Sequence, residues 1–163
     1  MAHALVLLLA LLIGVVAGLR AATAPAAVAW AVLLGWINLE GTWASWWGHP
    51  TAVIVLTVLA VLELIADKLP MTPSRQDPAS FGFRMVAGGF AGAVIGTAWG
   101  YTWGGLGAGI VGAVLGTLGG YEARRRLAAA KDGNAGRDLP VALLEDAVAV
   151  LGGFGIAALT GVL

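Results

Sequence analysis

The chain alternates between long apolar runs and short segments that hold almost all of its charge. Six runs are rich in Ala, Val, Leu, Ile and Gly: residues 4–19, 21–37, 51–66, 85–99, 104–120 and 141–163. A helix rises about 1.5 Å per residue, so about 20 apolar residues cross the hydrocarbon core of a bilayer. The pattern predicts an all-α integral membrane bundle of six transmembrane helices in a single domain, residues 1–163. The polar flanks of the shorter runs are expected in the membrane interface.

The basic residues predict the orientation of these spans. They occupy three segments that alternate along the chain: Arg20, then Lys68, Arg75 and Arg84, then Arg124, Arg125, Arg126, Lys131 and Arg137. Short cytoplasmic loops collect Lys and Arg, whereas translocated loops avoid them. We therefore expect both termini outside. The first run should remain as a helix rather than act as a cleaved signal peptide, because its positive charge follows the apolar residues instead of preceding them.

The composition agrees with a membrane location. The 163 residues are 60% hydrophobic and 11% charged, whereas soluble domains have about 25% charged residues. The chain has no cysteine, which excludes disulfides and thiolate metal sites. No basic stripe lies outside the loops that set topology, so no nucleic-acid partner is expected. The lipid bilayer is the expected partner, and no cofactor or metal is predicted.

Tryptophan marks the predicted outer face. Six of the seven Trp residues lie in or beside the two internal loops on that side: Trp36, Trp43, Trp46, Trp47, Trp99 and Trp103. Trp prefers the headgroup level of a bilayer. Residues 41–50 therefore either lie flat in the outer interface or form a buried loop that packs its indoles on the helix ends.

Small residues recur every four positions in the fourth and fifth runs: Gly88, Gly92, Gly96 and Gly100, then Gly104, Ala108, Gly112, Gly116 and Gly120. Rows of this kind allow another backbone to approach closely. The short connection between the two runs favours packing of the rows against each other as a tight hairpin. An oligomer seam and a permeation path lined by exposed carbonyls are the alternatives.

The order of the spans also permits a weak 3+3 inverted repeat, on which many small transporters are built. A shift of 82 residues aligns Leu62-Glu63 with Leu144-Glu145 and gives a few other short matches. A chain so rich in Ala, Gly and Leu shows nearly as many identities by chance. The repeat is therefore a hypothesis.

Ionisable residues gather at the predicted inner ends of the spans. The candidate substrate- or ion-binding residues are Arg20, Glu63, Asp67, Lys68, Arg84, Glu145 and Asp146. Ionised carboxylates inside an apolar span are costly, and they usually face the bundle interior, pair with a base or take up a proton. Arg20 and Arg84 have the right depth to be those bases. We expect both arginines to converge with Glu63 and Glu145.

Helix anchoring is the alternative role for such charges, because Lys and Arg at span ends extend readily toward water. We assign that role to Lys68, Arg75 and residues 124–126. Glu63 lies inside its apolar run, one turn before the charged end, so a functional role and a structural role are both kept for it.

The same residues carry a family resemblance. Four features follow one another along the chain: Gly18-Leu19-Arg20-Ala21, Glu63 with Ala66-Asp67-Lys68-Leu69-Pro70, Arg84 before a Gly-rich run, and Leu144-Glu145-Asp146. In these features the chain resembles a bacterial family of multi-pass membrane proteins of unknown function (domain of unknown function 4126). The resemblance implies a prokaryotic multi-pass protein, which we expect in the inner membrane. It implies no activity.

Two functions remain open. An acid–base cluster beside Gly-rich helices favours a small-solute or ion transporter or channel, in which Glu63 and Glu145 exchange protons or bind a cation and Arg20 and Arg84 counter them. Six short helices enclose little volume, which favours a homodimer. The alternative is a non-transporting scaffold or a protein that binds lipid headgroups. An enzyme is not expected, because no nucleophile–base pairing and no phosphate loop can be found.

Overall fold

The fold is helical throughout the part of the chain that the computed structural model describes, residues 2–67, 77–129 and 139–163. Those ranges form six α-helices and one 3₁₀ helix: α1 (Ala2–Leu19), α2 (Thr23–Leu33), η1 (Ser45–Gly48), α3 (Pro50–Ala66), α4 (Pro78–Ala98), α5 (Thr102–Ala129) and α6 (Leu139–Thr160). Each α-helix overlaps one of the six predicted apolar runs. The all-α fold class is therefore confirmed.

Three helical segments are long and apolar enough to cross a membrane: Pro78–Ala98, Thr102–Arg126 and Ala142–Thr160. Three further apolar helices are shorter: His3–Leu19, Thr23–Leu33 and Pro50–Ala66. These lengths and compositions fit a membrane protein. The 11 residues of α2 make about 16 Å of helix, roughly half of the hydrocarbon thickness. The predicted span 21–37 is therefore wrong as a continuous helix.

A glycine ends α2 four residues before its predicted end. Gly35 has φ +76°, a left-handed conformation that costs glycine little and other residues more. The Gly35 N–H donates to the carbonyl of Val32 at 3.0 Å, and the Trp36 N–H donates to that of Ala31 at 2.8 Å. This pair of bonds is the Schellman pattern of helix C-termini. The apolar pattern of residues 34–37 concealed this stop.

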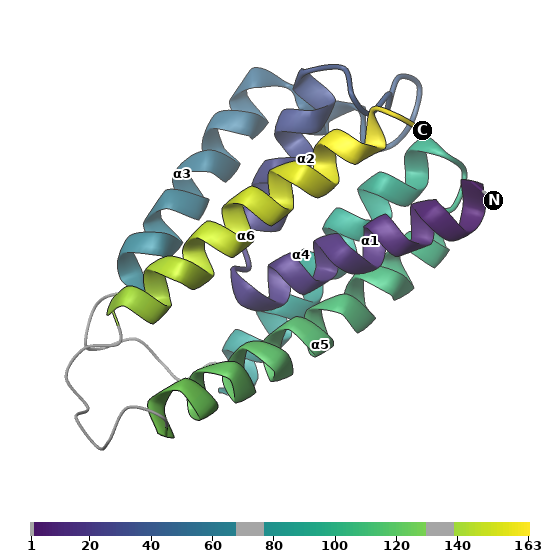
Figure 1. Ribbon diagram of the computed structural model, residues 1–163. Coiled ribbons are helices and arrows are strands. Elements are labelled where there is room, and N and C mark those ends of the chain that lie inside the picture. Colours follow the sequence, from purple (N-terminus) through teal and green to yellow (C-terminus); the bar gives the residue numbers. More distant parts are fainter. Residues whose placement is uncertain (1, 68–76, 130–138) are drawn as a thin grey trace.

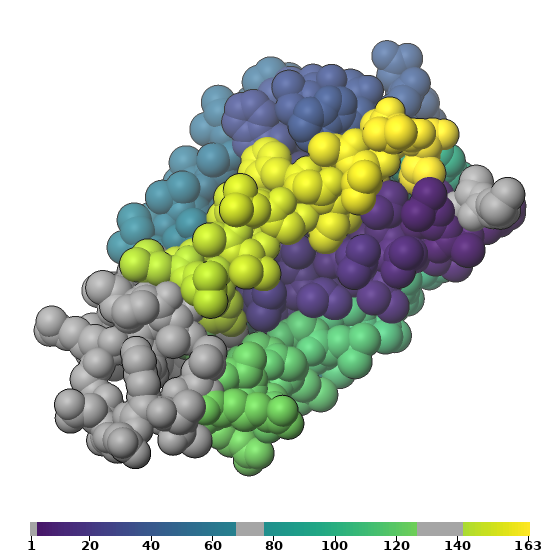
Figure 2. All heavy atoms as spheres, in the orientation of Figure 1, coloured from purple at the N-terminus to yellow at the C-terminus, as the bar shows by residue number. Residues whose placement is uncertain are grey.

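The helices form two groups. α1, α4 and α5 pack closely on one another, and α2 packs against α3 and α6. α6 also contacts α1, which joins the groups. The two chain termini lie at the same end of the bundle, which we call the terminal end (Figure 1). In the space-filling view α6 lies beside α1 along this face (Figure 2).

Gly109 lies where the backbones of α1, α4 and α5 come closest. A Cβ atom at this position would overlap the backbone of Gly88 in α4, and a Cβ atom on Gly14 of α1 would overlap the backbone of Gly109. Gly92 and Gly105 oppose each other in the same way between α4 and α5. The predicted α4–α5 hairpin is thus present. Small residues allow this approach because they place no side chain between the helices.

The α5 row that faces α4 differs from the predicted one. Gly105 and Gly109 face α4, whereas Gly112 and Gly116 face Leu11 and Val15 of α1. α5 therefore presents small residues on two faces. A single four-residue period in the sequence does not distinguish the glycines that face α4 from those that face α1. It also missed Gly14 and Gly18 of α1, which complete the second contact.

The connection between α2 and α3 folds back onto the bundle. Ile37 and Trp47 are buried, and the Trp47 ring packs on that of Phe90 in α4 with centroids 4.9 Å apart. Trp43 and Trp46 stay about half exposed. Each of the two interpretations of this segment thus describes part of it: one indole is buried, and two lie at the surface.

The packing of the helices does not favour an inverted repeat. Such a repeat would exchange α1 with α4 and α2 with α5. α1 packs closely along α5, whereas the exchanged pair, α4 and α2, shares a much smaller contact. The repeat remains a hypothesis without support from the helix contacts.

Candidate functional site

The chain reverses direction inside the bundle at residues 20–22, which we call the α1–α2 turn. α1 ends at Leu19 and α2 begins at Thr23. The hydroxyl of Thr117 in α5 donates to the carbonyl of Gly18 at 3.3 Å, and Thr117 lies twelve residues before α5 ends at Ala129. Twelve helical residues span about 18 Å. The turn therefore lies well inside the bundle, short of the end opposite the termini (Figure 1).

Arg20 is completely buried in this turn, at 0% exposure. Its Nε donates to Oδ1 of Asp146 in α6 at 2.6 Å. Its Nη1 pairs with Oδ2 of Asp67, the residue that follows α3. One guanidinium therefore holds two carboxylates from different helices. The expectation that Arg20 pairs with carboxylates is thus met, but by two aspartates rather than by Glu63 or Glu145.

Glu63 binds the backbone of the turn rather than an arginine. Its Oε1 accepts the N–H of Ala21 at 2.7 Å, and its Oε2 accepts the N–H of Ala22 at 2.8 Å. The first N–H groups of a helix have no partner within the helix. Ala22, the N-cap of α2, supplies no side-chain cap of its own. The Glu63 carboxylate therefore caps α2 from a neighbouring helix, where its charge also opposes the positive end of the helix dipole.

Arg84 binds main-chain carbonyls on the other side of the turn. This side chain of α4 is 4% exposed, and its Nη1 donates to the carbonyls of Gly18 and Leu19, each at 2.8 Å. The last carbonyls of a helix also lack partners within it. A cation at this position stabilises the negative end of the helix dipole of α1. Both helix ends at the turn are thus held by ionisable side chains from outside α1 and α2.

We call these five residues the turn cluster: Arg20, Glu63, Asp67, Arg84 and Asp146. Four helices, α1, α3, α4 and α6, supply or adjoin them, and all were among the seven sequence-based candidates. The sequence placed these residues near one another but gave the wrong partners. Arg20 pairs with the two aspartates, while Glu63 and Arg84 bind main-chain groups.

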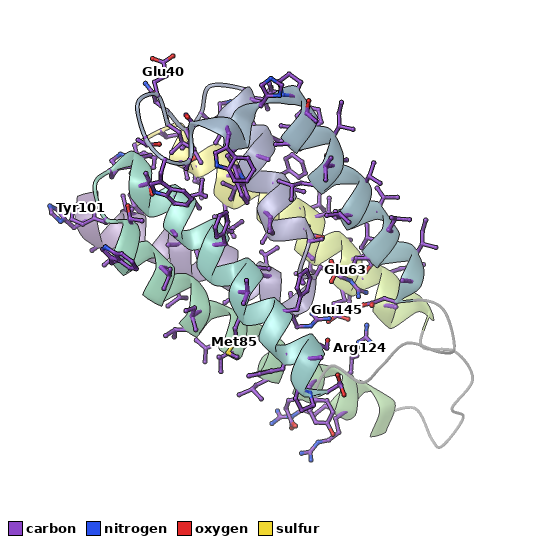
Figure 3. All side chains as sticks on the ribbon, turned by 180° about the vertical axis from the view of Figure 1, so that it is seen from behind. Glu40, Glu63, Met85, Tyr101, Arg124 and Glu145 are labelled. Atoms are coloured by element: carbon purple, nitrogen blue, oxygen red, sulfur yellow. The ribbon has the colours of Figure 1, made fainter. Side chains whose placement is uncertain are left out.

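Glu145 lies next to Asp146 in the sequence but has a different partner. Its Oε2 accepts from Nε of Arg124 in α5 at 2.7 Å. Glu63, Glu145 and Arg124, which are labelled in Figure 3, lie toward the same end of the bundle. The prediction that Glu145 converges with Glu63 on Arg20 and Arg84 is not met by these contacts. The assignment of Arg124 to anchoring alone is likewise incomplete, because Arg124 joins α5 to α6.

The helical period explains this difference. Successive residues point about 100° apart around a helix, so Glu145 and Asp146 cannot both face the turn. Asp146 is buried, and Glu145 is partly exposed. The sequence alone did not fix which of the two faces inward. Thr117, which sequence reasoning missed, gives no charge signal and sits within a Gly-rich run.

The candidate Lys68 and the predicted anchor Arg75 lie outside the described residues. Among residues 2–67, 77–129 and 139–163, no group of three or more His, Asp or Glu side chains is arranged to hold a metal ion. The chemistry available at the turn is therefore that of carboxylates and guanidinium groups that can exchange a proton, an ion or an ion-pair partner.

Comparison with known proteins gives one match. Residues 7–160 match the family described as "Domain of unknown function (DUF4126)". No curated protein and no solved structure matches the chain.

Proposed function

The chain belongs to the domain of unknown function 4126 family, whose description names no activity, and we propose that it is a small-solute or ion transporter or channel with the turn cluster as its site. The observation that carries the proposal is a helical hairpin that turns inside the bundle and is held there by ionisable side chains. In many transporters, helix ends that lie within the membrane form the substrate and ion sites. Here the main-chain groups of two helix ends are bound by Glu63 and Arg84, which a ligand would have to replace.

The depth of the turn cluster supports a location within the hydrocarbon core. Glu63 lies thirteen residues after α3 begins, and Arg84 and Asp146 each lie fourteen residues before α4 and α6 end. These lengths correspond to about 20 Å of helix, in a hydrocarbon core about 30 Å thick. Phe83 of α4 and Leu144 of α6 lie farther toward the opposite end of the bundle than Arg84 and Asp146, and they are 61% and 62% exposed. Exposed apolar side chains beyond the cluster are expected where lipid continues past it.

We propose that both termini face outside a bacterial inner membrane, as the distribution of basic residues predicts. In this orientation the terminal end of the bundle is the outer end. All six helices lie in the bilayer, but α1 and α2 turn back before the inner face. Non-helical backbone is tolerated at such depth only where protein encloses it or a water-filled cavity meets it. Glu63 and Arg84 meet that requirement by capping the turn.

In the proposed mechanism, a proton or a bound ion changes the charge of a carboxylate and so loosens its contact. Protonation of Glu63 would remove the charge that caps α2 and weaken its bonds to the two N–H groups of the turn. Protonation of Asp67 or Asp146 would weaken its pairing with Arg20. Because the site is buried, each change has a larger energetic effect than at a surface. Glu145, paired with Arg124, has no direct step in this mechanism.

A pocket at the other end of α2 also supports the proposed transport function. A half-open pocket of about 280 Å³ lies beside the C-terminus of α2, and its lining includes Val32, Asn38, Glu40 and Ser45. The first turn of α2 meets the turn cluster, and its last turn meets this polar-lined pocket. In the proposed orientation the pocket faces outside, where it would admit a small hydrophilic solute.

A binding test follows from this proposal. The melting temperature of the purified protein would be measured with Na⁺, K⁺, Cl⁻, phosphate and acetate. A ligand present at about 100 times its Kd stabilises the folded state by about 2.7 kcal/mol, which corresponds to a rise of about 5–10 °C for a chain of this size. We expect one of these solutes to give such a shift, and Glu63→Gln to abolish it. Glu122→Gln is the matched control, because Glu122 forms only exposed ion pairs on α5.

The second candidate function is binding of lipid headgroups. Three consecutive arginines lie near the inner end of α5, and the Arg125 and Arg126 side chains are 67% and 79% exposed. Basic clusters at this position attract anionic lipids. If only anionic lipid raises the melting temperature, equally in the wild-type protein and in Glu63→Gln, and Arg125→Ala/Arg126→Ala removes the effect, then the lipid-binding function replaces transport.

A further inference from the structure

α3 is the most weakly packed of the helices around the turn cluster. It lies at the edge of the bundle (Figure 1), and in the described part of the chain it packs mainly against α2 and η1. Val53 and Ala60 are its buried residues. Many of its other apolar side chains are about half exposed or more, including Ile54, Leu62 and Ile65, whereas Leu56 and Leu64 are partly buried.

The two halves of α3 are held differently. At the outer half, Val53 is 2% exposed and belongs to the main core, and the Thr57 hydroxyl accepts from Nε1 of Trp30 at 3.0 Å. At the inner half, Ala60 forms a small separate cluster with Ala22 and Ala26, against which Leu56 packs. Lipid chains can replace such contacts at little cost, since they are as apolar as the side chains they displace.

Two carboxylates join the inner half of α3 to the α1–α2 turn. Glu63 binds the N–H groups of Ala21 and Ala22, and Asp67 pairs with Arg20. The two residues are four positions apart and therefore share one helix face. Charge-assisted bonds of this kind are about twice as strong as neutral ones. The attachment of this half of α3 to the turn thus depends mostly on ionised carboxylates.

We infer that the inner half of α3 is the gate of the site, held closed by Glu63 and Asp67 and released when these carboxylates lose their charge. Separation of this half would open the α1–α2 turn to water on the inner side, while the Trp30–Thr57 contact keeps the outer half in place. The inference rests on the proposed function, and it assigns the moving element and its control to named residues.

Among residues 2–67, 77–129 and 139–163, the charged groups near the gate are those of the turn cluster. Glu63 faces only backbone N–H groups of the turn, and Asp67 faces Arg20. Arg20 is shared with Asp146 of α6, and Arg84 of α4 binds the opposite side of the turn. The helices packed against α3, namely α2 and η1, contain no charged residue. Loss of charge at both α3 carboxylates is therefore expected to release the inner half of α3, while Arg20 keeps Asp146 as its partner.

The absence of cysteine from the chain permits a direct test with single cysteines. Ala60→Cys reports the inner half of α3, and Val53→Cys, also buried, is the matched control in the outer half. A membrane-impermeant maleimide would be applied from the inner side of proteoliposomes. We expect slow labelling of both cysteines in the otherwise wild-type chain. In Glu63→Gln/Asp67→Asn we expect labelling of Ala60→Cys to rise at least about tenfold, because loss of even 1.4 kcal/mol shifts an equilibrium tenfold, with no rise for Val53→Cys.

Unchanged labelling of Ala60→Cys, or an equal rise at both cysteines, would overturn the gate. Glu63→Gln alone provides the same comparison if the double variant does not yield folded protein. Proton flux would be measured in the same vesicles to separate the two proposals. Selective labelling without flux leaves the gate in place and refutes transport. Flux that depends on Glu63 without selective labelling keeps transport and refutes the gate.

Discussion

Arg20→Met is expected to lower the free energy of unfolding by about 3–5 kcal/mol, the usual cost of removing one partner from a buried ion pair. The substitution removes the guanidinium that both Asp67 and Asp146 bind, and the side chains of these aspartates are only 16% and 11% exposed. Thermal unfolding in detergent should show this as a fall in melting temperature of about 10 °C.

The companion variant distinguishes charge from packing. Arg20→Met/Asp67→Asn/Asp146→Asn removes both carboxylate charges along with the guanidinium, and replacing a whole buried ionic group with neutral residues is often nearly neutral for stability. We therefore expect it to recover most of the loss. Equal destabilisation of the single and triple variants would contradict the ion-pair account and would make the volume of Arg20 the important property.

Gly109→Ala is expected to destabilise the bundle by about 1–3 kcal/mol, the typical cost of overpacking a close contact. The added methyl group would overlap the backbone of Gly88 in α4, and no flexible side chain lies there to move away. The close packing of α1 on the same glycine removes a second direction of relief. Melting temperature in detergent is again the measurement.

The matched control lies two residues away on the same helix. A Cβ atom on Gly107 would meet nothing within 4 Å. Gly107→Ala should therefore leave stability unchanged or raise it by up to about 1 kcal/mol through helix propensity. If both alanine variants had the same effect, the glycines of α5 would matter for helix propensity rather than for close packing.

The sequence predicts the helices of this fold well because each one coincides with an apolar run. The pattern of apolar residues did not reveal where α2 stops, since residues 34–37 are as apolar as the helix before them. The stop depends on the left-handed conformation of Gly35. The same limitation hid the burial of Arg20. Because Arg20 separates two apolar runs, the sequence indicates a loop residue. Its carboxylate partners come from α6 and from the end of α3, which are distant in the sequence.

The candidate site could be predicted as a set of residues but not as a set of contacts. Charges inside apolar runs or directly beside them are rare enough to be noticed, and this selected all five members of the turn cluster. Their partners depend on helix phase and on main-chain groups that a sequence does not display. Glu63 illustrates the point: its carboxylate binds two backbone N–H groups, and no pairing of acidic with basic residues could have indicated this.

Proton flux is the most direct test of the central claim that the turn cluster carries transport. The protein would be reconstituted in liposomes containing a pH-sensitive dye, and internal pH would be followed under an imposed pH gradient, with Na⁺, K⁺, Cl⁻ and acetate gradients added in turn. We predict flux above that of protein-free liposomes, reduced at least about tenfold, equivalent to 1.4 kcal/mol, by Glu63→Gln and by Asp146→Asn, and unchanged by Glu122→Gln. Flux that is equal in Glu63→Gln, Asp146→Asn and the wild-type protein, or absent under every gradient, would contradict the account.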